Sequence, residues 1–218
     1  MPADEAFQKK YRNEIARKIL HMCSFLIVIF IYFANRLTAC IVIGALLALL
    51  FIGNTLILSS RFTLINDIKV KYFSFLLRDD EKYGYISSNW FLLGCFLSVL
   101  LFPKYVAMLG ITVLIFGDAF AALIGMRFGK HKFKNGKSLE GTLGFIAVSW
   151  LFLAGFVLLL PDAGTAFAVA SLISIPVVAV AEIYSKQIKI DDNLVIPIVF
   201  GILACVLMKI FEISGLFL

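Results

Sequence analysis

The sequence predicts an all-α integral membrane protein with about seven transmembrane helices, and its composition and its apolar runs lead to that prediction. Hydrophobic residues make up 61% of the 218 residues, and charged residues make up 16%. Soluble domains average about 45–50% apolar and about 25% charged residues, so the excess is too large for a soluble core. The apolar residues gather in runs long enough to cross a bilayer, which takes roughly 20 residues in a helix. We therefore expect a single polytopic membrane domain over residues 1–218.

Seven apolar runs are candidates for transmembrane helices. The first follows a polar segment that ends near Lys18, and because no small-residue cleavage site follows it, we expect a retained span rather than a cleaved signal. The third begins at Asn89 and is short because it ends at Pro103. The fifth begins directly after a basic loop, and the seventh begins after an acidic pair. The expected spans are 19–35, 37–58, 89–103, 105–126, 141–160, 165–184 and 193–213.

The distribution of positive charge predicts the orientation, because cytoplasmic loops of membrane proteins carry an excess of Lys and Arg. Most of the 20 basic residues lie in four segments, which are residues 1–18, the linker 59–88, the loop 127–140 and the short loop before the last span. With seven spans, all four segments fall on the same side. We therefore expect a cytoplasmic N-terminus and an external C-terminus. In this setting the net charge of +6 indicates topology rather than nucleic-acid binding.

The linker 59–88 mixes charged and aromatic residues. An amphipathic helix lying along the cytoplasmic interface would account for that mixture. A solvated loop accounts for it equally well, and both interpretations stay open.

Asp118 places a carboxylate inside an apolar run, about eight residues or roughly 12 Å from the cytoplasmic end of its span. A carboxylate at that depth costs at least a few kcal/mol unless it is paired, metal-bound or facing a wet cavity. A structural carboxylate, hydrogen-bonded inside the bundle, is the plainer alternative. The small neighbours of Asp118 let another backbone or a ligand approach, although such residues alone usually indicate helix packing. These neighbours are Gly117, Ala119, Ala121, Ala122 and Gly125.

The loop after this span is basic, and it ends where a new apolar helix begins. Its basic residues are Arg127, Lys130, His131, Lys132, Lys134 and Lys137. Topology and attraction to anionic lipid are one explanation for that charge. The other is a phosphate site, because backbone N–H groups at a helix start bind phosphate well and Ser138, Gly141 and Thr142 stand at this start. A buried carboxylate, a basic loop and a helix N-terminus together predict a site for Mg²⁺ and a polyphosphate.

Further polar residues fall on the same predicted side of the membrane. Arg17 and His21 are four residues apart and therefore share a helix face. Taken singly, these two are typical of interfacial anchors, Glu182 of a structural carboxylate, and the acidic pair of a helix cap. Their convergence on one membrane face favours a functional site. The set comprises Arg17, Lys18, His21, Asn89, Glu182, Asp191, Asp192 and Asn193.

In order along the chain, EIARKILH, GDAFAALIGMRFGK, KSLEGT and DDNLVIP resemble the motifs of the CTP-dependent lipid-alcohol kinases. That family includes dolichol kinase, phytol kinase and the fungal-type diacylglycerol kinase. The resemblance runs from about residue 14 to residue 197, and its motifs are specific together and weak singly. The central pattern is also similar to that of phosphatidate cytidylyltransferase, which belongs to the same broad superfamily.

The resemblance implies an integral membrane enzyme that uses CTP and a divalent metal such as Mg²⁺. By motif, Asp118, Asp192, Lys137 and His21 would be catalytic, and Asp118 with Asp192 or Glu140 would hold the metal. The base for the acceptor hydroxyl stays open among Asp192, Glu182 and His21. The residues implied to bind the nucleotide are Arg17, Lys18, Arg127, Lys130, Ser138, Glu140, Gly141, Thr142 and Asn193.

The leading hypothesis is transfer of the γ-phosphate of CTP to the hydroxyl of a membrane lipid, a polyprenol or dolichol, phytol or diacylglycerol, at the cytoplasmic face. The first alternative is a phosphatidate cytidylyltransferase, which makes CDP-diacylglycerol. The kinase is favoured because the chain lacks the long C-terminal signature of that enzyme and offers only IKIDDNLVIP before an apolar helix. The second alternative is a small transporter with coupling carboxylates. Which lipid is used, the choice of CTP over ATP and the oligomeric state are open at this stage.

Overall fold

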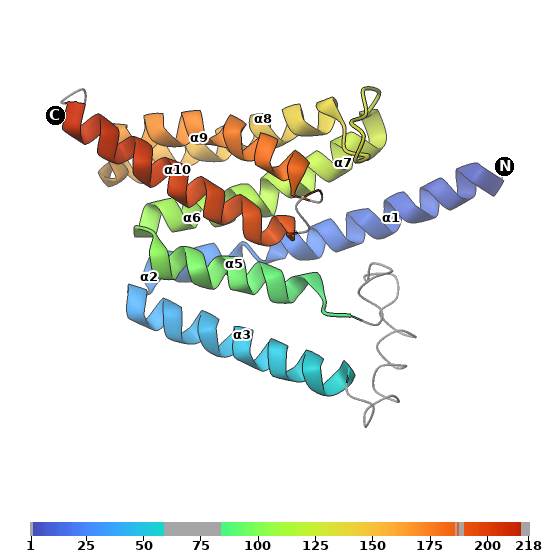
Figure 1. Cartoon of the computed structure of the whole chain (residues 1–218), viewed down its shortest axis with the longest axis horizontal. Coiled ribbons are helices and arrows are strands. Elements are labelled where there is room, and N and C mark those ends of the chain that lie inside the picture. The colour runs from blue at the N-terminus through green and yellow to red at the C-terminus, as the bar shows by residue number, and fades with distance from the viewer. Residues whose placement is uncertain (1, 59–83, 186, 188–189, 215–218) are drawn as a thin grey trace.

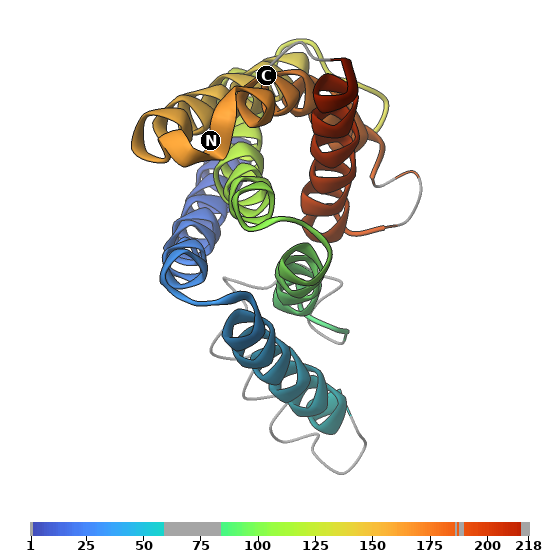
Figure 2. The same cartoon turned by 90° about the vertical axis from the view of Figure 1, so that its left-hand side faces the viewer.

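The protein is a bundle of helices, seen from the side in Figure 1 and from one end in Figure 2. The structure is a computed structural model, and it describes residues 2–58, 84–185, 187 and 190–214. Within these ranges there is no β-strand, only an isolated bridge between Lys132 and Ser138. The elements are α1 (Pro2–Cys23), α2 (Leu26–Phe33), α3 (Arg36–Leu58), α5 (Ser87–Leu101), α6 (Lys104–Thr112), the π-helix η2 (Val113–Gly117), α7 (Asp118–Phe128), α8 (Leu139–Leu159), the 3₁₀-helix η3 (Pro161–Ala163), α9 (Gly164–Tyr184) and α10 (Asp192–Ser214).

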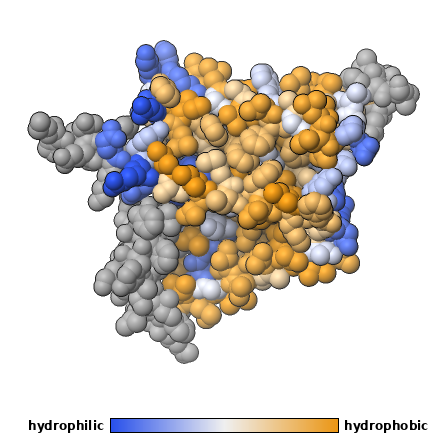
Figure 3. All heavy atoms as spheres, turned by 180° about the vertical axis from the view of Figure 1, so that it is seen from behind, coloured by the Kyte–Doolittle hydropathy of each residue, from blue (hydrophilic) through white to orange (hydrophobic). Residues whose placement is uncertain are grey.

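The expected all-α, multi-pass membrane fold is confirmed. Among the described residues, six segments are long and apolar enough to cross a membrane, namely Tyr11–Phe33, Arg36–Leu58, Lys104–Phe128, Leu139–Leu159, Pro161–Tyr184 and Asp192–Phe211. The short third run forms α5, an apolar helix of 15 residues. The linker expected over 59–88 lies outside the described residues except for its last few positions. Figure 3 shows a broad hydrophobic band on one face, with hydrophilic residues gathered toward its two sides.

The first span differs from the expected single helix over 19–35. Helix α1 already begins at Pro2, and the chain turns at Ser24 and Phe25 before α2 continues. The amides of Ser24 and Phe25 donate to the carbonyls three residues earlier, each at 3.0 Å, so the helix tightens there. No Pro or Gly marks this break in the sequence, which is why apolar periodicity did not indicate it.

The span formed by α6, η2 and α7 is the central helix of the bundle. Of the residues in its most apolar stretch, 67% are buried inside the protein, against 11% of the residues in the corresponding stretch of α3. The central helix contacts α1, α2, α5, α8 and α10, whereas α3 lies at the periphery against α5 (Figure 2). The carboxylate of Asp118 therefore belongs to the most enclosed of the six long spans that the structure describes.

The connections at one end of the bundle bring the basic segments together. The N-terminal half of α1 and the loop between α7 and α8 lie toward the right of Figure 1, and α10 starts at its end nearest to them. The end of α3 and the start of α5 reach the same end. The basic linker lies mostly outside the described residues, so the expected same-side arrangement of all four segments, and the side of the membrane that this end faces, stay predictions.

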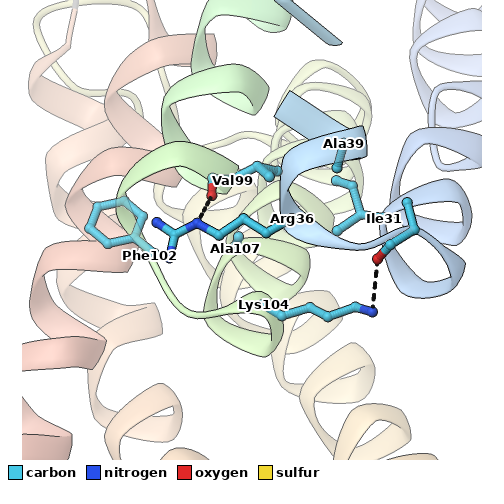
Figure 4. Close-up of a pocket in the computed structure, with 8 residues that line it drawn as sticks. Ile31, Arg36, Ala39, Val99, Phe102, Lys104 and Ala107 are labelled. Carbon is cyan, nitrogen blue, oxygen red and sulfur yellow. Dashed lines mark hydrogen bonds between the residues drawn. The ribbon is translucent and has the colours of Figure 1, made fainter. Parts of the chain in front are cut away.

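At the opposite end of the bundle, the side chains of Arg36 and Lys104 donate hydrogen bonds to carbonyl oxygens at the ends of helices (Figure 4). The Arg36 side chain donates to the carbonyl oxygens of Val99, at 3.1 Å, and of Leu100. Lys104 Nζ donates to the carbonyl oxygens of Tyr32 at 2.6 Å and Ala34 at 3.2 Å. Positive side chains are favourable at helix C-termini, so these contacts tie α2, α3, α5 and α6 together around a small, mostly apolar pocket.

Candidate active site

Asp118 forms a buried ion pair with Lys18, which brings the first span onto the central helix. The Lys18 ammonium donates to Asp118 Oδ2, and both residues are buried. A buried charge is tolerated when it is paired and hydrogen-bonded. The carboxylate that the sequence singled out and a cation from a segment 100 residues away therefore share one site.

The backbone immediately before Asp118 is irregular. Residues Val113–Gly117 form a turn of π-helix, and Asp118 begins the α-helix that follows. The amide of Asp118 donates to the carbonyl oxygen of Leu114. Single π turns inside α-helices often accompany functional sites, because they change the register of the side chains that follow.

A second ion pair lies beside the first and joins the basic loop to the last two helices. The Lys137 ammonium donates to the Glu182 carboxylate and to the Glu182 carbonyl oxygen at the end of α9. It lies 3.8 Å from Asp192 Oδ2 at the start of α10. The basic loop is therefore anchored at the centre of the site by Lys137.

The carboxylates of Asp118, Glu182 and Asp192 converge. Each offers an oxygen, the three oxygens lie within 4.8 Å of one another, and all three residues are buried. Fully ionised, three carboxylates facing the two ammonium groups of Lys18 and Lys137 leave one uncompensated negative charge. Buried charges of like sign are stable together only with a counter-charge. Oxygen donors so arranged are the ligands that a hard divalent cation such as Mg²⁺ prefers, so the donor set fits the expected metal.

The loop between α7 and α8 holds its shape through local bonds. The Phe133 amide donates to the Lys137 carbonyl at 2.8 Å, and the Leu139 amide donates to the His131 carbonyl at 2.9 Å. Gly136 has a φ of 84°, a left-handed conformation that favours glycine. The Asn135 side chain, which the sequence analysis did not single out, donates to the carbonyl oxygen of Ile183 and so docks the loop on α9.

The start of α8 is capped by the protein itself. Ser138 is buried, its Oγ accepts the Gly141 amide at 3.2 Å, and its carbonyl oxygen accepts the Thr142 amide at 3.0 Å. Helix α8 lies close against α7 here, because a Cβ added at Gly141 would come within 2.6 Å of the Ala121 carbonyl oxygen. The small residues around Asp118 therefore serve close helix packing. The sequence predicted free donors to phosphate at these three positions. In the structure the Gly141 and Thr142 amides already donate to Ser138, and Ser138 itself caps the helix.

The other expected residues take four kinds of position. Glu140 stands apart from the buried carboxylates and accepts from the His131 amide at 3.2 Å and from its ring at 2.7 Å. Arg17 pairs with Glu14 one turn away, and Asn193 bonds with Asp191 at the start of α10. Arg127 and Lys130 are exposed on the loop. His21 lies within electrostatic range of Asp118 and Asp192.

Glu182 is more central than the sequence alone indicates. The sequence analysis gave it a structural role or that of a base, and it named Glu140 as a metal ligand instead. In the structure Glu182, not Glu140, lies with Asp118 and Asp192. A signal was present, since Glu182 is the only acidic residue in the apolar run of its span. Its partner Lys137 was not inferable from spacing, because 45 residues separate the two.

The fold and the site define a multi-pass helical membrane protein with a buried cluster of carboxylates and lysines near one end of its bundle. The chain is 32% identical to the uncharacterized protein RP860 of Rickettsia prowazekii over 203 residues, which cover 89% of this chain and 92% of that protein. The chain belongs to the same family as that protein.

Two relatives with a named activity are more distant and match in part. The chain is 31% identical to CTP-dependent diacylglycerol kinase 1 of Schizosaccharomyces pombe over 143 residues, 61% of this chain and 65% of that kinase. It is 24% identical to the enzyme of the same name from Saccharomyces cerevisiae over 152 residues, 67% of this chain and 52% of that kinase. The chain thus spans between half and two thirds of these kinases. No protein-family model and no solved structure matches it.

Proposed function

We propose that this protein is a CTP-dependent lipid kinase that transfers the γ-phosphate of CTP to the hydroxyl of a membrane lipid. The partial homology to CTP-dependent diacylglycerol kinases supports this function. One structural observation carries it: five charged side chains from the first span, the central helix, the basic loop and the last two helices meet in one buried cluster. Phosphoryl transfer needs mainly positioning and neutralisation of charge, which such a cluster supplies.

In this proposal Asp118, Glu182 and Asp192 hold the divalent metal. Mg²⁺ is usually bound by one or two carboxylates together with phosphate oxygens and water. The metal neutralises charge on the phosphate oxygens of the bound nucleotide. Glu140 instead fixes the loop through His131, so that Lys137 is held in place.

Lys18 and Lys137 are the cations nearest to the transferred phosphoryl group. Preorganised positive groups in a site with little water stabilise the charge that develops in the transition state. Arg127 and Lys130, which are exposed on the loop, attract the triphosphate toward the site from solution. Arg17, Asn193 and the Ser138–Thr142 turn position these groups rather than contact the phosphates.

The acceptor is a lipid alcohol, with polyprenol, phytol and diacylglycerol as the candidate classes. The cluster includes Lys137 of the loop between α7 and α8 and Asp192 at the start of α10, which lie toward the predicted cytoplasmic end of the bundle. A lipid hydroxyl reaches that level from the bilayer, and CTP reaches it from the cytoplasm. Both substrates therefore meet without either crossing the membrane.

Labelled CTP tests the proposed function. We expect purified protein in lipid vesicles with Mg²⁺ to move label from the γ-phosphate of CTP into one lipid of a panel of polyprenols, phytol and diacylglycerol. ATP in parallel tests the nucleotide, and Asp118→Asn is the inactive control. Label appearing in pyrophosphate, with phosphatidate as acceptor, would identify a cytidylyltransferase instead. No turnover of CTP with any lipid would contradict both enzymes and favour the transporter.

A further inference from the structure

His21 presents a buried nitrogen that has no hydrogen-bond partner in the protein. Among the described residues, four buried side-chain atoms lack a hydrogen-bond partner, and Nε2 of His21 is one of them. The others are Asn89 Nδ2, Ser149 Oγ and Ser171 Oγ. His21 follows Lys18 by one turn of α1, and its ring is within electrostatic range of Lys18, Asp118 and Asp192. A polar atom left unpaired beside so many charges indicates a missing ligand.

The three carboxylates of the site are already engaged. Lys18 holds Asp118, Lys137 holds Glu182, and the same ammonium lies 3.8 Å from Asp192. In the proposed function they also hold the metal. A carboxylate bound to a cation is a weak acceptor for a further proton. Histidine is the side chain whose neutral form accepts protons near pH 7, and it is the commonest general base in enzymes.

The surroundings of the ring constrain its orientation. The Phe91 ring of α5 packs edge-on against the imidazole, with 5.0 Å between the ring centroids. In the tautomer that carries its proton on Nδ1, the lone pair lies on Nε2, the nitrogen without a partner.

We propose that His21 is the catalytic residue that removes the proton from the lipid hydroxyl, an inference that rests on the proposed kinase function. The hydroxyl O–H bond breaks and its proton moves to Nε2, while the hydroxyl oxygen forms a bond to the γ-phosphorus. The bond from the γ-phosphorus to the β,γ-bridging oxygen breaks, and CDP leaves with that electron pair. The histidine then returns its proton to solvent or to the departing CDP.

His21→Gln tests this role, because glutamine keeps the volume and a donor but has no basic nitrogen. We expect kcat to fall by about 100-fold or more, the usual range for loss of a general base. Binding of Mn²⁺ and of CTP should stay within about threefold of the wild-type values, since His21 holds neither. Cys23→Ser, an exposed position two residues further along α1, is the matched control and should keep kcat.

An acceptor of higher acidity separates base catalysis from a structural role. A lipid alcohol with fluorine on the carbon adjacent to the one that carries its hydroxyl loses its proton more readily. The decrease in kcat caused by His21→Gln should therefore shrink to about tenfold or less with that acceptor. Equal defects with both alcohols, or a lost affinity for Mn²⁺, would show a structural role and overturn the inference. A variant within threefold of the wild type would overturn it while leaving the kinase function standing. An inactive wild-type protein would contradict the function and the inference together.

Discussion

The Lys18–Asp118 pair permits a quantitative prediction about stability. The two side chains are only 6% and 10% exposed. Removing one partner of a buried pair leaves the other charge uncompensated, which costs about 3–5 kcal/mol. We therefore expect Lys18→Met to lower the free energy of unfolding by about 3–5 kcal/mol, and Asp118→Asn to lower it by a similar amount. In the double variant neither charge remains, so most of the loss should be recovered.

The neighbouring pair between Arg17 and Glu14 supplies the control. Its side chains are 28% and 15% exposed, and it joins residues one turn apart on the same helix. Pairs of this kind are worth about 0–1 kcal/mol, so Arg17→Met should cost no more than that. Unfolding in mixed micelles by added SDS, followed by tryptophan fluorescence, measures all four variants. Equal costs for Lys18→Met and Arg17→Met, or a double variant whose cost is the sum of the single ones, would refute the reasoning.

Three further predictions concern packing and the metal site. Gly141→Ala should destabilise the protein and reduce its activity, because the new Cβ meets the Ala121 carbonyl. The control is Gly155→Ala on the same helix, whose Cβ meets nothing within 4 Å. That variant should be neutral or stabilising by up to about 1 kcal/mol in the same unfolding assay. Glu182→Gln should weaken Mn²⁺ binding by tenfold or more and Glu140→Gln should not, which electron paramagnetic resonance can measure; the reverse order would restore Glu140 as the ligand. Lys137→Met should bind Mn²⁺ more tightly than the wild type without nucleotide, since the ammonium no longer competes for the carboxylates, and unchanged binding would show that it does not compete.

The transmembrane architecture was predictable because the bilayer imposes a length and an apolar composition on each span. The break at Ser24 and Phe25 and the π turn at Val113–Gly117 were not, because no Pro marks either one and tertiary packing selects them. The short helix α5 was recognised from Asn89 and Pro103 at its limits. Composition thus predicts where helices lie, and packing decides where they depart from regularity.

The candidate site was predictable in its members more than in its contacts. A carboxylate as deep as Asp118 is conspicuous because burial makes charge costly. The ion pairs themselves were not predictable, because Lys18 and Glu182 lie far along the chain from their partners and reach them only in the folded bundle. Glu140 follows the basic loop directly in the sequence, and it was therefore predicted to be a metal ligand. In the structure Glu140 instead accepts hydrogen bonds from His131 of the basic loop. The assignment of roles to all these residues stays a proposal.

The cluster draws on both the first and the last spans of the chain, and this has a consequence for how the protein is made. A membrane protein enters the bilayer as it is synthesised, so Lys18 and Asp118 can pair long before Asp192 leaves the ribosome. Until α10 is inserted, the metal-binding group lacks one of its carboxylates. Under the proposed function, a nascent or truncated chain without α10 would therefore be unable to consume nucleotide, and the proposed activity would begin only when α10 has been made.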